Sequence, residues 1–167
     1  GLGDVYKRQH HIRARAATIG RVVDLGITDA NNMGAAMAPA ACDTIVTHLK
    51  DLERTVDDYD WIITGDLGRF GSEMLFSLCR ERGVDLSGRH LDCGNLIFHP
   101  EQDVKCGGSG CGCSAVTLSA MLLDRIERGD CRRMLFLATG ALLSPTVTLQ
   151  GESIPGIAHA VVLEQEG

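Results

Sequence analysis

Short apolar segments alternate with helical segments along most of the chain, and this alternation narrows the folds open to it. The short apolar segments typical of strands are Trp61–Thr64, Arg133–Ala138 and Ile157–Leu163. Apolar side chains return at helical spacing over residues 35–50, 72–82 and 114–128. The pattern predicts an α/β fold with a mixed, mostly parallel sheet and helices on its faces. No helix is expected between the last two strands, so the last strand should pair antiparallel.

Two segments are harder to assign from the pattern. Residues 12–24 are expected to be extended, whereas residues 89–99 are ambiguous, with strand character at Leu96, Ile97 and Phe98. The helix over 114–128 is expected to follow a glycine-rich stretch and to end at Gly129. Its expected apolar face is Ala115, Leu118, Leu122 and Ile126.

The bulk properties fit one globular domain of 167 residues, with 44% hydrophobic and 23% charged residues. A net charge of −6 without a basic stripe argues against nucleic-acid binding. No apolar run approaches the roughly 20 residues that a membrane span needs. The chain does not start with Met, so residues 1–11 are expected to be a non-native or disordered leader before a domain at 12–167.

The chain has seven cysteines, an odd number, and several of them lie in apolar segments. This usage suits reduced thiols better than a disulfide framework. Cys42, Cys79 and Cys131 are expected to be core residues. His48 lies on an apolar helix face and is expected to be a satisfied core histidine, and His159 to pack or face solvent.

Three loops qualify as a ligand site, because ligands of α/β sheets gather beyond the carboxyl ends of the strands. All three leave a strand or enter a helix and contain glycine and small polar residues. They are Gly65–Gly68, Gly107–Ser114 and Thr139–Pro145.

The glycine-rich stretch at 107–112 has two interpretations. Glycine allows close approach, and free N–H groups before a helix attract anions. The same pattern also suits a plain strand-to-helix crossover. The Cys-x4-Cys-x-Cys spacing does not match a zinc site, so no metal is expected. No cofactor is expected either. A nucleophilic cysteine would need a nearby histidine as base, and the three loops contain none.

The segments resemble the C-terminal half of the thiolase superfamily and, more closely, the stage V sporulation protein AD family of endospore-forming bacteria. The matching segments span nearly everything from Ile12 to Glu164. They are "GRVVDLGITDANNMGAAMAPAACDTI", "DDYDWIITGDLG", "DCG", "GGSGCGCSA", "ATGALLSPT" and "ESIPGIAHAVVLE".

The resemblance implies a protein of the forespore, which takes up dipicolinic acid with calcium. It implies a dipicolinic-acid-binding component, peripheral on the cytoplasmic side or surface of the forespore inner membrane. Implied partners are other membrane-associated sporulation proteins and an N-terminal half of the same protein; homodimers are also frequent in this fold. The ligand-binding residues expected on this basis are Gly65, Asp66, Gly108, Ser109, Gly110 and Thr139.

The same resemblance argues against catalysis. Gly65 stands where ketoacyl synthases have a catalytic His, and Ser109 where thiolases have another His. Thr139 stands at about the place of the second thiolase cysteine. No catalytic residue is therefore expected, because acyl condensation needs a base and donors for the developing oxyanion. Two alternatives remain: an acyltransferase whose nucleophile lies in the missing half, and a structural subunit of a membrane transport complex.

Overall fold

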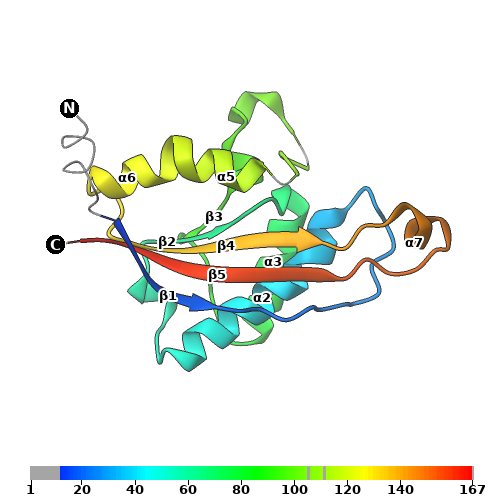
Figure 1. Cartoon of the computed structure of the whole chain (residues 1–167), viewed down its shortest axis with the longest axis horizontal. Helices are drawn as coiled ribbons and strands as arrows, with labels where there is room; N and C mark the ends of the chain where they lie inside the picture. Colours follow the sequence, from blue (N-terminus) through cyan, green and yellow to red (C-terminus); the bar gives the residue numbers. More distant parts are fainter. Residues whose placement is uncertain (1–11, 105, 111, 167) are drawn as a thin grey trace, which may run out of the picture.

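The computed structural model describes residues 12–104, 106–110 and 112–166 and has a five-stranded sheet with helices on both faces (Figure 1). The expected leader at 1–11 and Cys111 lie outside the described residues. The strands are β1 (Ile12–Thr18), β2 (Trp61–Thr64), β3 (His90–Asp92), β4 (Arg133–Ala141) and β5 (Gly156–Gln165). The longer helices are α2 (Met33–Asp51) and α3 (Gly68–Glu81).

The order of the strands is β1-β5-β4-β2-β3. β2 pairs in parallel with both β3 and β4, whereas β5 runs antiparallel to both β4 and β1. Four strands therefore share one direction and the last strand opposes them, which confirms the predicted sheet. A short helix, α7 (Pro145–Leu149), was not expected and lies in the connection between β4 and β5.

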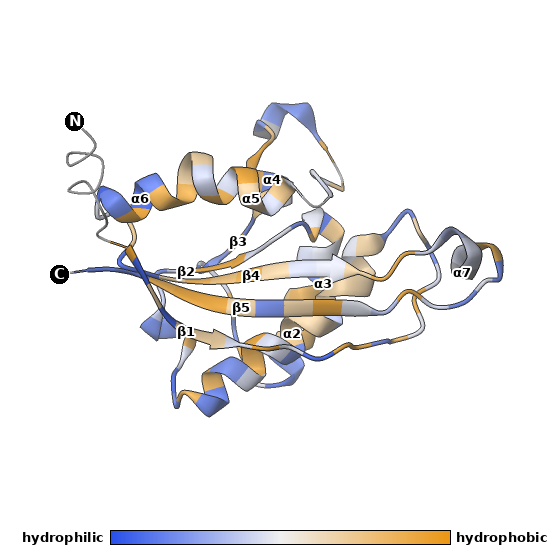
Figure 2. Ribbon diagram, viewed as in Figure 1, coloured by the Kyte–Doolittle hydropathy of each residue, from blue (hydrophilic) through white to orange (hydrophobic). Residues whose placement is uncertain are grey.

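Two apolar cores hold the layers together. On one face, α2 and α3 pack against Ile62, Leu135 and Val162. On the other face, the helix that follows the glycine-rich stretch packs against Ile63 and Phe136. The first half of β4 is strongly apolar and the half near the loop ends is paler (Figure 2). The part of β4 nearest the gathered loops is therefore less apolar than its middle.

The predicted core histidine is confirmed. His48 is fully buried, with Nδ1 at 2.7 Å from the Thr18 hydroxyl and Nε2 at 2.6 Å from the Tyr59 hydroxyl. Cys42, Cys79 and Cys131 are buried as expected.

The predicted strand character at 96–98 is wrong. The strand of this segment, β3, is at His90–Asp92. Residues Cys93–Leu96 form a helical turn, α4. The Asp92 carboxylate accepts the Asn95 N–H (3.2 Å) and so acts as the N-cap of this turn. A short 3-10 turn, η2 (Pro100–Gln102), follows, and another, η1 (Val56–Asp58), precedes β2.

The helix after the glycine-rich stretch also differs from expectation. It consists of α5 (Cys113–Thr117), a π-helical turn η3 (Leu118–Leu122) and α6 (Leu123–Glu127). Its buried positions are Cys113, Thr117, Leu122 and Ile126, and Ala115 is exposed. The wider π turn adds one residue between Thr117 and Leu122, which moves the inward face of the first turns away from Ala115. Helix α3 also begins earlier than predicted, at Gly68.

Candidate ligand site at the ends of β2 and β4

Asp66 joins the three predicted loops. Its Oδ1 accepts the Thr139 hydroxyl (2.8 Å), and its own N–H donates to Thr139 Oγ1 (3.2 Å). Its Oδ2 accepts the Ser109 hydroxyl (3.3 Å) and the Gly110 N–H (3.2 Å). The structure therefore brings together the exit of β2, the last part of β4 and the glycine-rich stretch, as the sequence predicts, although Thr139, expected to begin a loop, lies within β4. Their role as a ligand site stays a prediction.

Two backbone N–H groups of the glycine-rich stretch already have acceptors inside the protein. Gly108 N–H donates to the Gly94 carbonyl (2.7 Å), and Gly110 N–H donates to Asp66. The anion that meets this stretch in the structure is thus the Asp66 carboxylate. An anionic ligand at the same point would meet a negative charge and not free donors. The bonds from Ser109 and Gly110 to Asp66 are long and both residues are exposed, so these contacts are weaker than the 2.8 Å bond between Thr139 and Asp66.

Gly65 and Thr139 approach each other so closely that no side chain fits at position 65. A Cβ added to Gly65 would lie 2.6 Å from Thr139 Oγ1 and 3.2 Å from Thr139 N. Thr139 cannot easily move, because its hydroxyl is tied to Asp66. The space for a side chain at the position where the resemblance places a catalytic His is therefore filled by Thr139 of the neighbouring strand, β4.

A second carboxylate, Asp92, holds the segment that follows Asp66 in place. The sequence analysis did not single out this residue. It is buried and accepts the Thr64 hydroxyl (2.6 Å) and the N–H groups of Leu67 (2.9 Å) and Gly68 (3.0 Å). Burial raises the pKa of Asp92, and these donors act in the opposite direction. Asp92 thereby fixes the start of α3 directly after Asp66. Sequence reasoning missed Asp92 because it is the last residue of a strand of only three residues.

His90 contacts Thr64 and is not one of the residues bonded to Asp66. The Thr64 hydroxyl gives its one proton to Asp92, so His90 donates its Nε2–H to Thr64 Oγ1 at 2.9 Å. Burial lowers the pKa of His90 to about 4, so the ring is neutral near pH 7. His159 is exposed and accepts the Gly20 N–H at 3.1 Å.

The two buried thiols of this region, those of Cys93 and Cys113, are poor nucleophiles. Cys113 begins α5, and its Sγ donates to the Gly65 carbonyl at 3.7 Å. Burial raises the pKa of Cys113, and it raises that of Cys93 to about 12. Across the described ranges, no group of three or more His, Cys, Asp or Glu side chains could hold a metal ion.

A small hollow of about 80 Å³ opens beside Asp66 and Ser109. Its other walls are the start of α2 with Asn31 and Asn32, and Phe70 of α3, none of which the sequence analysis singled out. Gly34 and Gly71 bring these helices together, since a Cβ on Gly71 would lie 2.9 Å from Gly34 Cα. Glycine at both positions is thus what brings the Asn31–Asn32 turn to the site.

The arrangement of one sheet, helices on both faces and loops gathered at the ends of β2 and β4 defines a thiolase-like half-fold. The chain superimposes on an acetyl-CoA acetyltransferase of Bacillus anthracis with a TM-score of 0.51 and 15% identity, over 98% of this chain and 33% of that chain. Human mitochondrial 3-ketoacyl-CoA thiolase matches with a TM-score of 0.49 and 15% identity, over the same shares. At these identities, the likeness concerns the fold alone.

The sequence comparisons are more specific. The profile of the family described as Stage V sporulation protein AD matches residues 2–164. The chain belongs to this family. It is similar to Stage V sporulation protein AD of Bacillus subtilis (strain 168), with 52% identity over 156 residues. The matched part is 93% of this chain and 46% of that relative, so the chain spans about half the length of its relative.

Proposed function

We propose that this sporulation protein binds dipicolinic acid and carries out no acyl transfer. The observation that most supports the absence of acyl transfer is the contact between Gly65 and Thr139, where even a Cβ would lie 2.6 Å from the threonine hydroxyl oxygen. A thiolase or ketoacyl synthase needs an imidazole or an equivalent group near this point. The loops offer a glycine, two hydroxyls and a carboxylate, which suit recognition and positioning better than proton transfer.

The ligand would lie at the mouth formed by Asp66, Ser109, Gly110 and Thr139. Dipicolinic acid is a dianion at neutral pH, and Asp66 adds a negative charge at this point. Calcium that accompanies the ligand would reduce this repulsion. The small hollow beside Asp66 is part of a larger site if the half of the protein that precedes this one in its relative supplies another wall.

The proposed setting is the surface of the forespore inner membrane, where other sporulation proteins of the uptake apparatus would be partners. No helix within the described ranges has an apolar stretch long enough to cross a bilayer. Attachment through partner proteins is the form of membrane association that we propose, with a homodimer as one arrangement of the full-length protein.

The variant Gly110→Val in the full-length protein tests the site. Gly110 has a φ of +110°, so a branched side chain strains the loop and disturbs the contact between its N–H and Asp66. We expect weaker dipicolinic acid binding by calorimetry. Gly88→Val is the matched control, because Gly88 also has a positive φ with open space around it and precedes β3 at the opposite end of the sheet.

Both variants should lose stability by about 1 kcal/mol or more, and only Gly110→Val should lose affinity. Equal affinity of both variants, with lowered melting temperatures, would mean that the glycine-rich stretch is only a crossover between strand and helix.

A further inference from the structure

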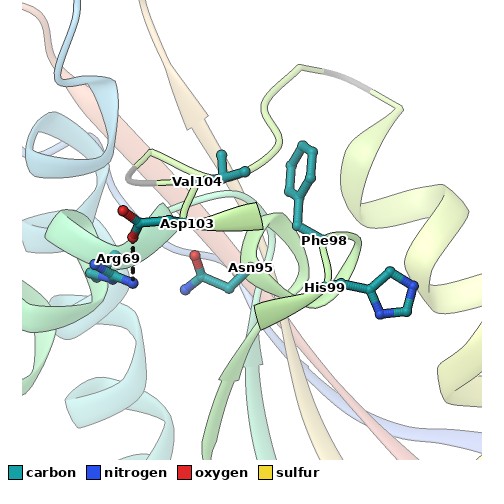
Figure 3. Close-up of a pocket in the computed structure, with 7 residues that line it drawn as sticks. Arg69, Asn95, Phe98, His99, Asp103 and Val104 are labelled. Atoms are coloured by element: carbon teal, nitrogen blue, oxygen red, sulfur yellow. Dashed lines mark ion pairs between the residues drawn. The ribbon is translucent and has the colours of Figure 1, made fainter. Parts of the chain in front are cut away.

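A second hollow of about 220 Å³ lies on the other side of the glycine-rich stretch (Figure 3). It is bounded by Arg69 of α3, Asn95 of α4, Phe98, Asp103 and Gly107. A cavity of about 150 Å³ is enough to hold benzene. This hollow therefore has room for one aromatic ring with small substituents.

Arg69 lines this hollow, and its contacts within the protein give no structural reason for an arginine at this position. It lies in the first turn of α3, where the helix dipole gives a cation no stabilisation. Its ion pair with Asp103 is long, at 3.6 Å, and the two side chains are 54% and 72% exposed. Exposed pairs of this kind contribute little to folding. A carboxylate from outside can therefore replace Asp103 as the partner of Arg69 at small cost.

Asn95 supplies a second polar group on the same side. Its backbone N–H is used in the cap by Asp92, but within the described residues its side-chain amide has no hydrogen-bond partner. Figure 3 shows this amide pointing towards Arg69 and Asp103. An amide and a guanidinium that face one space match the donors with which proteins bind carboxylates.

The remaining walls are fixed in place. Gly107 has a φ of +69°, and a Cβ there would lie 2.8 Å from the Gly94 carbonyl oxygen. The Gly108 N–H holds the same carbonyl at 2.7 Å. Phe98, which is partly buried, stands on another side of the hollow and offers an apolar surface (Figure 3). The backbone wall is thus formed before any ligand arrives.

From this arrangement we infer that the Arg69 hollow is a subsite for small aromatic carboxylates, with Arg69 and Asn95 holding the carboxylate and Phe98 lining the far, apolar side of the hollow. Asp103 is the internal counter-ion that the ligand displaces. The inference rests on the proposed function only for the choice of dipicolinic acid as probe. It adds a carboxylate-binding group, Arg69, beside the mouth at Asp66, where the Gly108 and Gly110 N–H groups already have acceptors.

The test compares three variants of the full-length protein by calorimetry, with dipicolinic acid and benzoate as separate probes. Arg69→Gln should weaken binding of both probes by about tenfold or more, the size expected for a lost charged hydrogen-bond partner. Asp103→Asn should strengthen binding, because it removes the competing carboxylate. Asn also tolerates the φ of +44° at this position. Arg80→Gln, an exposed arginine on the same helix, should bind as the wild type does.

The outcomes separate this inference from the proposed function. Dipicolinic acid binding that is unchanged in Arg69→Gln, with an unchanged melting temperature, would overturn the subsite and leave the proposed function standing. Arg69-dependent binding of benzoate, without dipicolinic acid binding, would support the subsite and contradict the proposed ligand. A wild-type protein that binds neither probe would contradict both.

Discussion

Gly65 and Thr139 meet where β2 and β4 end, and this contact decides what the site can contain. Each residue alone is unremarkable in sequence, and the resemblance identified them only as replacements for catalytic groups. The structure adds the reason why a larger residue does not fit at position 65, since Thr139 Oγ1 occupies the space and is held by Asp66. The absence of a side chain at position 65 and the tight packing of the two strands are one structural feature.

At the scale of this residue we predict that Gly65→Ala destabilises the protein by about 1–3 kcal/mol, the usual cost of an added methyl group in a packed region. The added Cβ would force either Thr139 or the backbone after β2 to move. Chemical denaturation of the full-length protein measures this change in the free energy of unfolding.

Gly140→Ala is the control for that variant, because its Cβ would lie at an ordinary 3.5 Å from Ile157 Cγ2. It should change the free energy of unfolding by less than about 0.5 kcal/mol. Equal effects of the two variants would show that the contact with Thr139 is not tight.

Among the elements, β2 and β3 are joined beneath the site by a chain of hydrogen bonds from His90 through Thr64 to Asp92. Sequence reasoning found β2 at its observed bounds but placed the next strand character at 96–98. Periodicity alone could not find β3, because it has only three residues and its last residue also caps α4. The shifted apolar face of the helix after the glycine-rich stretch has a similar origin, because a π turn leaves no distinct sequence pattern.

The pairing of β2 and β3 predicts a pH dependence. The pKa of His90 is about 4 in the folded protein, below its ordinary value of 6.5, so proton uptake by His90 favours the unfolded chain. Its contribution to stability is full above pH 6.5 and is lost as the pH falls towards 4. The raised pKa of Asp92 acts in the opposite direction, so the comparison must be made between variants.

His90→Gln should therefore reduce the loss of unfolding free energy between pH 6.5 and 4, by up to about 1.4 kcal/mol for each pH unit. Denaturant unfolding at several pH values measures this slope. His159→Gln, which changes an exposed histidine, should keep the slope of the wild type. A wild-type slope in His90→Gln would contradict the assigned protonation of His90.

For the whole molecule, the sequence predicted the layers, the antiparallel last strand and the meeting of three loops at one end of the sheet. These features depend on the alternation of apolar and helical segments and on the rule that parallel strands place their carboxyl ends together. The sequence did not reveal that Asp66 would occupy the Gly110 N–H, nor that Arg69 and Asn95 would face one hollow. Such pairings depend on side chains that are distant along the chain.

The central claim is binding without acyl transfer, and calorimetry of the full-length protein tests it most directly. Dipicolinic acid, and acetoacetyl-CoA in the presence of CoA, are injected in separate runs, because the instrument detects both saturable binding and continuous turnover. We predict saturable heat with dipicolinic acid and no continuous heat with acetoacetyl-CoA and CoA, since position 65 has no room for a catalytic side chain. Continuous heat from acetoacetyl-CoA and CoA without saturable binding of dipicolinic acid would contradict the account.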